Sequence, residues 1–578
     1  MSYTDGSGLV TTQSYDSVGR LITVANEHGT RTIGYDGGGE RGSLPTSLDV
    51  SGVGVFTARY GTDGALVREE LPGGLSATTV RDAAGDALRL TYVKTAADGS
   101  TSEWLKSTAT INGFDQVDSY QTEAVTGLTR TNRYGYDNLG RLVSATDWAA
   151  QQADGLPTGP SCTRSYTFDV NSNRTSLTQQ ATAGAPGGTC PATVASASSY
   201  GYDSADRLKV DAARATLRYD AFGRTRVLPS IDTVDGGGDV ALDFCVDDLV
   251  AGMAQGGRTS VFGLDAAARR GGAHRSDAAT PGVARRTVSL YGGDDDNPDV
   301  VREPDNSYTR NITSFGGLAA VVTKNGTSGA EVTWQLANLH GDIAATVPAG
   351  AETHRDLRVT ETTEYGLPWA KPAAGSTQAR YGWLGTHQRD ASTIGGLTLM
   401  GVRLYAPTVG RFLTVDPVEG GNPNAYIYPT DPINMLDLDG RWGWLKKAFR
   451  HVKKHWRGYV QAAAIGACVV ATVGGCFFVG VGVAVATNFR GRRGFDWRGA
   501  AVDIAVAGVE AGIGRGLARV GHSTGWMLPR IRNYGRHAAP LRVSERVRGA
   551  GARLAGGMGQ AAAFGGMGNG LKRDARLR

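Results

Sequence analysis

The sequence is poor in cysteine and proline, and the few it holds are not arranged as in the protein classes that depend on them. The 5 cysteines include no Cys-x-x-Cys pair, so neither a zinc site nor another metal or cofactor site is predicted. Proline numbers 20 and glycine does not recur at every third position, which excludes a collagen-like chain. The first six residues lack the basic and apolar runs of a secretion signal and already begin within the repeat described below. We therefore expect the chain to be the C-terminal part of a longer protein.

Glycine, in contrast, is abundant. Its 83 copies in 578 residues are twice the usual share of about 7%. Together with 21 tyrosines and many threonine, valine and arginine residues, this composition predicts short strands joined by tight turns. Apolar residues make up 40% and charged residues 20%, which is enough apolar material for a large folded body. The sequence thus predicts a mainly β protein and disfavours helical bundles and α/β folds over most of its length.

The charge is divided unevenly along the chain. Residues 1–440 carry 36 basic and 50 acidic groups, a net charge of −14, whereas residues 441–578 carry 24 and 5, a net charge of +19. A basic tail of this kind suits phosphate polymers, anionic lipid or the acidic body itself. The alternative is a basic tail that is merely solvated.

A short unit, Tyr-Asp-x-x-Gly-Arg-Leu, recurs along the first part of the chain. The aromatic residue ends a strand, the aspartate accepts backbone N–H groups of a turn, and glycine takes the left-handed position. Arginine and leucine then open the return strand, so repeated copies in register predict consecutive β-hairpins. The best copies are Tyr15-Asp16 with Gly19 and Tyr136-Asp137 with Gly140; looser ones are Tyr202-Asp203, Tyr219-Asp220 with Gly223, and Phe168-Asp169.

These repeats resemble those of the Rhs/YD-repeat family of bacterial proteins. The resemblance covers roughly residues 1–440, with interruptions near 150–160 and 180–198. It implies a continuous β-sheet spiral that forms a hollow, cocoon-like shell, here residues 1–380. An unrelated β-solenoid or sandwich with Asp-Gly turns is the alternative.

Residues 381–440 resemble the Rhs repeat-associated core. That pattern is carried here by Tyr381 to Thr386, Arg403 to Pro407, Gly410-Arg411-Phe412, Asp416-Pro417, Asn424, Tyr426, Tyr428, Asp431-Pro432, Asn434 and Asp437 to Gly440, with Asn338 to Ile343 upstream. In several family members this core cuts its own chain with an aspartyl-protease-like pair of carboxyl groups supported by an arginine.

The resemblance places that pair on Asp416 and Asp437 and the arginine on Arg403. Two close carboxyl groups can share a proton, so that one activates water while the other polarises the carbonyl. The cut bond would follow Gly440, next to Arg441.

Three features depart from the family pattern. Asp437 is followed by Leu438 rather than proline, Arg441 stands where leucine is usual, and the spacing between Asp416 and Asp437 is about two residues short. The alternative is that these aspartates only form turns that close the shell. Asp439 is a second candidate for the catalytic position.

The tail, residues 441–578, is expected to be a helical, Gly/Ala-rich and basic effector held in the shell. Apolar residues from Trp444 to Trp456 recur at helical spacing and predict an amphipathic basic helix. Residues 459–489 contain no charged side chain and are long enough to span a bilayer. We expect either membrane insertion after release, a spacer packed inside the shell, or an aid to translocation.

Other candidate chemistry in the tail is weak. His451 and His455 lie four residues apart, but no third ligand follows, so solvated histidines are favoured over a metal site. The last sixty residues include His522 and His537 but no HExxH motif, Walker loop, zinc-deaminase signature or Ser-His-Asp order. A basic nuclease therefore stays a minor alternative, and nucleic acid is not the expected partner.

The sequence as a whole predicts a polymorphic-toxin-like protein that encloses, cuts and releases its tail, and that is secreted or associated with the cell surface. Its expected partners are its own tail, a cognate immunity protein and an anionic membrane. The alternative is a cell-surface adhesion protein that binds carbohydrate and has no catalytic activity. Cys162 and Cys190 flank a Gly/Thr/Ala-rich stretch and are expected to form a disulfide only in an oxidising compartment.

Overall fold

The computed structural model describes residues 1–441, apart from 38–43, 152–156, 183–189, 266–269, 277–284, 294–295, 304, 306, 327–328, 374–378 and 419–422. The predicted helical tail, with its apolar segment 459–489 and its four histidines, lies outside the described residues. Within the described part there are four 3-10 helices and no α-helix; these are η2 (Ser230–Asp232), η3 (His354–Asp356), η4 (Gly385–His387) and η5 (Ile394–Gly396). None of the helices described there is long and apolar enough to cross a membrane. The prediction of a mainly β body is confirmed.

The first large sheet has 16 strands, each paired antiparallel with the next one along the chain. Its strands are β1 (Ser2–Thr4), β2 (Val10–Tyr15), β3 (Leu21–Asn26), β4 (Gly29–Tyr35), β5 (Pro45–Val50), β6 (Gly54–Tyr60), β7 (Leu66–Leu71), β8 (Leu75–Arg81), β9 (Ala87–Thr95), β10 (Thr101–Ile111), β11 (Val117–Ala124), β12 (Thr129–Tyr136), β13 (Leu142–Gln151), β14 (Pro157–Phe168), β15 (Arg174–Ala181) and β16 (Ala197–Ser199).

The second large sheet has 13 strands in the same sequential order. They are β17 (Arg218–Tyr219), β18 (Thr225–Leu228), β19 (Val240–Phe244), β20 (Val250–Gln255), β21 (Arg258–Leu264), β22 (Arg270–Ser276), β23 (Arg285–Leu290), β24 (Val300–Arg302), β25 (Tyr308–Ser314), β26 (Gly317–Lys324), β27 (Ala330–Ala337), β28 (Ile343–Pro348) and β29 (Arg358–Val359). A small third sheet holds β30 (Thr398–Met400), β31 (Arg403–Ala406) and β32 (Arg411–Phe412).

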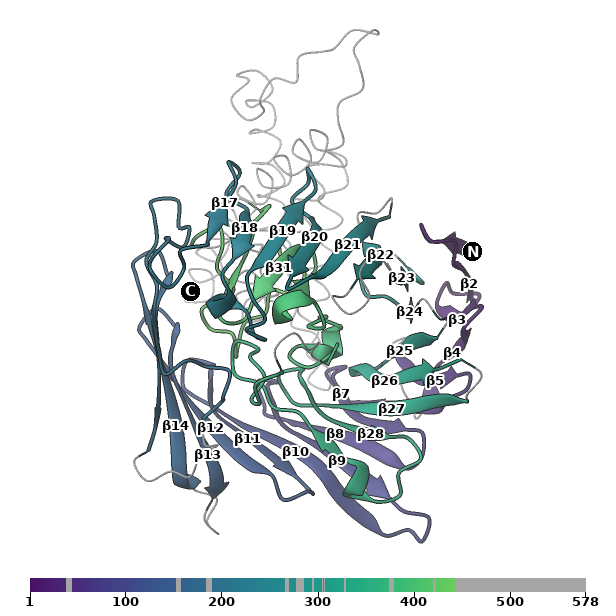
Figure 1. The fold of residues 1–578 in the computed structure, drawn as a ribbon. Coiled ribbons are helices and arrows are strands. Elements are labelled where there is room, and N and C mark those ends of the chain that lie inside the picture. Colours follow the sequence, from purple (N-terminus) through teal and green to yellow (C-terminus); the bar gives the residue numbers. More distant parts are fainter. Residues whose placement is uncertain are drawn as a thin grey trace, which may run out of the picture. The chain divides into compact units, whose positions relative to one another are not determined.

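The two large sheets curve toward each other, and strands β25–β28 lie over β7–β9 as a second layer (Figure 1). Buried side chains from β5–β10 and β25–β28 form one hydrophobic cluster between these layers, in which the rings of Phe56 and Trp334 meet edge to face at 5.9 Å. A second cluster joins β10–β20 to residues of the small sheet, including Leu404 and Ala406. The curved wall therefore encloses the core segment that carries the candidate site.

The repeat turns have the predicted hydrogen bonds. Asp137 Oδ1 accepts the backbone N–H groups of Leu139 at 2.9 Å and Arg141 at 3.0 Å, and its Oδ2 accepts Arg141 Nε at 2.7 Å. The same three bonds form at Asp16, Asp203 and Asp220. Burial would raise the pKa of Asp137, but the hydrogen bonds from Arg141 outweigh it and hold that pKa below its ordinary value.

The left-handed turn position is not reserved for glycine. Gly19, Gly140 and Gly223 occupy it with positive φ, but Asp206 (φ 59°) and Ser172 (φ 64°) occupy it in the copies that lack glycine. Aspartate tolerates this region better than most residues. The turn is therefore determined mainly by its leading aspartate.

Neighbouring repeats are also tied to each other, which the sequence pattern did not reveal. The hydroxyl of Tyr35 donates to the carbonyl of Leu21, which opens the return strand of the preceding repeat, at 2.9 Å. The hydroxyls of Tyr136 and Tyr202 make equivalent bonds to the preceding hairpins. In the opposite direction, Arg141 Nη1 donates to the carbonyl of Asp169 in the next turn, at 2.9 Å. The tyrosine and arginine of the repeat thus connect successive hairpins by hydrogen bonds.

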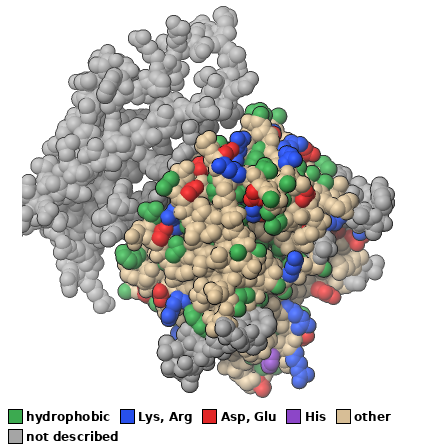
Figure 2. Space-filling view, turned by 60° about the vertical axis from the view of Figure 1, so that its left-hand side comes forward, with side chains coloured by type: hydrophobic (Ala, Val, Ile, Leu, Met, Phe, Trp, Pro, Cys, Tyr) green, Lys and Arg blue, Asp and Glu red, His purple; other side chains and the backbone are tan. Residues whose placement is uncertain are grey.

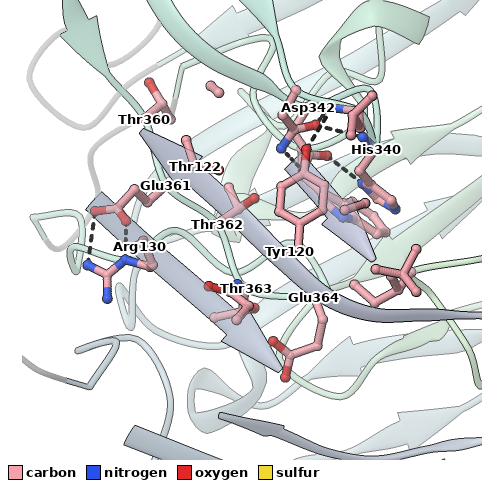
Figure 3. A pocket seen from close by; sticks show the side chains of 18 of the residues that line it. Tyr120, Thr122, Arg130, His340, Asp342, Thr360, Glu361, Thr362, Thr363 and Glu364 are labelled. Atoms are coloured by element: carbon pink, nitrogen blue, oxygen red, sulfur yellow. Dashed lines mark hydrogen bonds and ion pairs between the residues drawn. The ribbon is translucent and has the colours of Figure 1, made fainter. Parts of the chain in front are cut away.

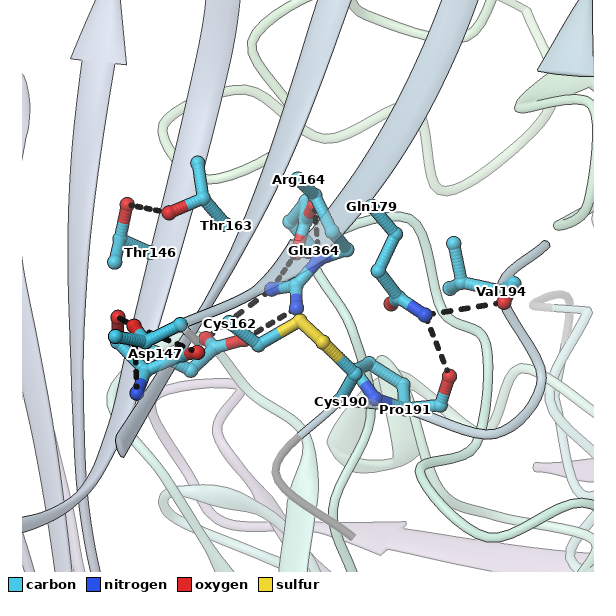
Figure 4. Close-up of a disulfide and its surroundings, with 12 residues drawn as sticks. Thr146, Asp147, Cys162, Thr163, Arg164, Gln179, Cys190, Pro191, Val194 and Glu364 are labelled. Atoms are coloured by element: carbon cyan, nitrogen blue, oxygen red, sulfur yellow. Dashed lines mark hydrogen bonds and ion pairs between the residues drawn. A yellow bond between two sulfur atoms is a disulfide. The ribbon is translucent and has the colours of Figure 1, made fainter. Parts of the chain in front are cut away.

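Cys162 on β14 and Cys190 form a disulfide, a pairing that the sequence had left open (Figure 4). Beside it lies the buried guanidinium of Arg164, which contacts the carboxylates of Asp147 and Glu364. The disulfide and this ion cluster together fix the region where an insertion interrupts the repeats.

Charged side chains of both signs are scattered over the face shown in Figure 2, and neither sign forms one large patch there. The acidic surplus of residues 1–440 is therefore not concentrated on this face.

Candidate functional site

Residues of the core segment form hydrogen bonds to the repeat turns. The hydroxyl of Tyr426 donates to the carbonyl of Gly223 at 2.7 Å, and Arg411 Nη2 donates to the carbonyl of Asp206 at 2.5 Å. Asn434 Nδ2 donates to the hydroxyl of Tyr136 at 3.0 Å. The turns of three different repeats therefore fix the position of the core segment, which explains why the two sequence patterns occur together.

The predicted trio, Arg403, Asp416 and Asp437, is brought together and buried. Arg403 Nη2 donates to Asp416 Oδ2 and to Asp437 Oδ2, each at 2.9 Å. The guanidinium carbon of Arg403 also lies 3.6 Å from the centroid of the Phe412 ring. Asp437 has no solvent exposure, and Arg403 and Asp416 are 2% and 7% exposed. Because the two carboxylate oxygens share one nitrogen, they lie within two hydrogen-bond lengths of each other.

The predicted cleavage site lies against this trio. The backbone N–H of Arg441 donates to Asp437 Oδ1 at 3.1 Å and to Asp439 Oδ1 at 3.2 Å. Gly440 is left-handed (φ 64°), and a Cβ there would come 2.5 Å from the carbonyl oxygen of Met400. Only glycine fits without displacing this backbone. The peptide bond between Gly440 and Arg441 is thus placed with its nitrogen facing two carboxyl groups.

The segment around this bond is anchored on both sides. The carbonyl of Asp439 accepts the N–H of Val402 at 3.0 Å, and the carbonyl of Leu438 accepts Arg389 Nη1 at 2.8 Å. These contacts hold residues 438–441 alongside the start of β31.

The pKa values of Asp437 and Arg403 are shifted from their ordinary values. Burial raises the pKa of Asp437 to about 6; attraction to Arg403 opposes this, while Asp439 and Asp416 add to it. Burial lowers the pKa of Arg403, although both carboxylates oppose that shift. Asp437 can therefore keep a proton close to neutral pH, as a general acid must.

A separate pocket of about 140 Å³ lies between β11, β12 and the residues that follow β29 (Figure 3). It contains the predicted upstream motif: His340 Nδ1 lies 3.0 Å from Asp342 Oδ1, and His340 Nε2 lies 2.8 Å from the carbonyl of Pro432. Burial alone would lower the pKa of His340, but Asp342 raises it above its ordinary value. Both ring nitrogens are occupied, so His340 ties this hairpin to the core segment and is not available as a base.

No group of three or more His, Cys, Asp or Glu side chains that could hold a metal ion occurs in the part of the chain that the structure describes. The sequence offered Asp439 only as an alternative to Asp437 at the catalytic position. In the structure both aspartates accept the backbone N–H of Arg441. The contact of Arg389 with the carbonyl of Leu438 was not predicted, because no sequence motif marks this arginine.

No protein-family model matches the chain. Among curated proteins it is similar to the tRNA3(Ser)-specific nuclease WapA of Bacillus spizizenii, with 30% identity over 167 residues, and to the tRNA nuclease WapA of Bacillus subtilis strain 168, with 32% identity over 115 residues. These matches cover 28% and 19% of this chain, and 7% and 5% of the relatives. The chain therefore spans less than a tenth of their length.

Among solved structures it is similar to the TcdB2-TccC3-TEV crystal structure and to a Photorhabdus luminescens Tc holotoxin pore, each with a TM-score of 0.58. Identity is 17% and 16%, and the matches cover 75% and 76% of this chain but 21% of each of those chains. The likeness at this level concerns the fold alone. The similarity to the WapA proteins and the shared fold support the resemblance to Rhs/YD-repeat proteins that the repeated Tyr-Asp turns indicate.

Proposed function

We propose that this chain belongs to a polymorphic toxin, in which the β-wall holds the core segment while that segment cuts the chain after Gly440 and releases residues 441–578. The observation that carries this proposal is the 3.1 Å hydrogen bond from the Arg441 amide to the buried carboxyl group of Asp437. A turn-forming aspartate alone would not need a second buried carboxylate on the same arginine.

The reaction is a hydrolysis whose atoms these side chains can direct. Asp416 takes a proton from a water molecule as the water oxygen bonds to the Gly440 carbonyl carbon. The lone pair of the Arg441 nitrogen is then no longer delocalised into the carbonyl and accepts a proton from Asp437; the C=O bond reforms as the bond between carbon and nitrogen breaks, which leaves a carboxyl group on Gly440 and an amine on Arg441. Arg403 fixes both carboxyl groups and offsets their repulsion.

The charge of the tail supports its retention by the wall. Residues 441–578 carry a net charge of +19 and residues 1–440 one of −14, and opposite charges attract most strongly where water is partly excluded. On this proposal the released tail acts on an anionic target, and the producing cell needs a cognate immunity protein. The uncharged run 459–489 favours a membrane as that target, and the names of the curated relatives make RNA the competing one.

The mass of the purified full chain tests the cleavage. We expect residues 1–440 and a fragment of 138 residues that begins at Arg441. Asp437→Asn and Asp416→Asn should each give the intact 60.5 kDa chain, whereas Asp98→Asn, in an exposed turn, should be cut like the wild type. An intact wild-type chain would refute the proposal.

The target of the tail needs a second experiment. Residues 441–578 are released from the purified, cut chain with denaturant and diluted into anionic vesicles or into tRNA. Leakage of vesicle contents without loss of tRNA supports membrane action, and degraded tRNA with intact vesicles assigns the tail to the nucleases.

A further inference from the structure

Six successive turns of the wall share a geometry that leaves two positions free. In each five-residue turn the fourth residue has a positive φ, as Asp115, Ser172 and Asp248 do, and its backbone N–H donates to the carbonyl of the first. The second and third residues are not needed for this turn, so their side chains can be of any kind. The six turns are residues 112–116, 137–141, 169–173, 203–207, 220–224 and 245–249.

At these free positions, five of the six turns carry a large apolar side chain that is exposed. The exposed fractions are 86% for Phe114, 73% for Leu139, 96% for Val170, 75% for Phe222 and 103% for Val246. Scattered exposed apolar residues are normal on a protein, but a series of them on neighbouring turns indicates a contact surface. We call these five side chains the tip row.

The six turns are neighbours along one edge of the wall. Figure 1 shows the turns that follow β17 and β19 side by side at this edge. Two strands separate one turn from the next, so the tips are spaced by roughly 10 Å. The contacts between successive turns are Gln116 Nε2 to the carbonyl of Gly140 (3.3 Å), Arg141 Nη1 to the carbonyl of Asp169 (2.9 Å), Asn173 Nδ2 to Asp206 Oδ1 (2.8 Å), the guanidinium of Arg207 over the ring of Tyr219 (5.7 Å) and Arg224 Nη1 to the carbonyl of Cys245 (2.9 Å).

The backbone of the same turns binds the core segment. Asn424 Nδ2 donates to the carbonyl of Asn171 at 3.0 Å, and the hydroxyl of Tyr426 donates to the carbonyl of Gly223. A Cβ on Gly223 would come 3.5 Å from the side chain of Val415, the residue before Asp416. The tip row therefore lies one turn away from the proposed cleavage site, and its side chains stay exposed while the turns hold the core.

The charges of these turns exclude an anionic partner. In three turns the opening aspartate forms an ion pair with the arginine of its own turn. The other three turns contain aspartate but neither lysine nor arginine. The tip row is thus neutral to weakly acidic, and anionic lipid or nucleic acid would find no basic group there.

The composition and spacing of the tips favour lipid over protein. Leucine and valine are rare among the residues that dominate protein interfaces, where tryptophan, tyrosine and arginine prevail. The tips are also separated by polar residues such as Asn138 and Ser204, so they form no continuous patch that a protein could bury. The fluid interior of a bilayer can surround each apolar side chain separately.

We propose that the tip row inserts into the surface of an electrically neutral lipid bilayer and docks the wall on the membrane. The wall makes this contact, so it depends neither on the cleavage proposed above nor on the basic tail. It brings the core segment close to the membrane, because the same turns carry both.

The test is sedimentation of the full chain with phosphatidylcholine vesicles in about 0.5 M salt, which screens the basic tail. We expect the wild type to bind, and Leu139→Ser combined with Phe222→Ser to bind about tenfold or more weakly, since two large apolar side chains no longer enter the lipid. Val170→Ser with Val246→Ser should weaken binding about threefold. The matched control is Val10→Ser with Val55→Ser, two exposed valines near the starts of β2 and β6; it should bind like the wild type.

The alternatives give different results. The proposal is refuted if the wild type does not bind, if the tip variants bind as tightly as the wild type, or if binding requires anionic lipid and is abolished by salt. Self-association without vesicles that Leu139→Ser with Phe222→Ser abolishes would also refute it, because the row would then bind a second copy. Wild type that binds but is not cut refutes the cleavage alone. Circular dichroism verifies that the variants fold.

Discussion

Aspartate and arginine are paired in two regions of this molecule, with opposite effects on the acid. In the repeat turns, Asp137 and Arg141 keep 23% and 15% of their side-chain surface exposed, and the hydrogen bonds win over burial, so the pKa of Asp137 falls. In the core, Asp437 and Arg403 are each 1% exposed, and burial wins, so the pKa of Asp437 rises to about 6. The two pairs have the same composition, but only in the core pair does burial outweigh the attraction to arginine and raise the pKa of the aspartate.

The two regions also differ in the hydrogen-bond donors that their aspartates share. Asp137 accepts two backbone N–H groups and the side chain of Arg141, so its charge is satisfied within its own turn. In the core, one nitrogen of Arg403 serves both Asp416 and Asp437. The turns are therefore expected to tolerate loss of the arginine better than the core does.

Among the substitutions that test this difference between core and turns, Arg403→Ala is expected to lower the free energy of unfolding most. It leaves two buried carboxyl groups without their shared cation, which typically costs about 3–5 kcal/mol. Denaturant unfolding should show this loss relative to Asp437→Asn, since both chains are expected to stay uncut. If the free energies of unfolding of the two chains differ by less than about 1 kcal/mol, the core pair behaves like an exposed one and the proposed difference between core and turns is wrong.

A smaller effect is expected in the turns. Asp137→Ala removes two backbone hydrogen bonds and one ion pair, for a loss of about 2 kcal/mol, measured by the same unfolding assay in the Asp437→Asn background. Asp98, which accepts only Ser100 and has no arginine partner, provides the matched control. If Asp98→Ala destabilised the chain as much as Asp137→Ala, the arginine of the repeat would contribute nothing.

Much of this fold could be predicted because its repeat is local. The turn around Asp137 is closed by residues within four positions, so its pattern is visible in the sequence. The bonds from Tyr35 to Leu21 and from Arg141 to Asp169 depend on which hairpins are neighbours, and the repeat alone does not state that order.

The site divides in the same way. Arg403, Asp416 and Asp437 could be named from their order in the core segment. Their burial could not, because it arises from packing against Phe412 and from turns hundreds of residues away, such as that of Gly223. The exposed position of Asp439 beside a buried acid likewise depends on tertiary structure.

The pH dependence of wild-type cleavage tests the central claim most directly. A carboxyl group whose pKa is raised by folding keeps its proton below that pKa and loses it as the pH rises through it. The rate at which the fragment beginning at Arg441 appears should therefore fall as the pH rises through about 6, the pKa of Asp437. A rate that is constant or rises across that range would contradict the assignment of buried Asp437 as the proton donor.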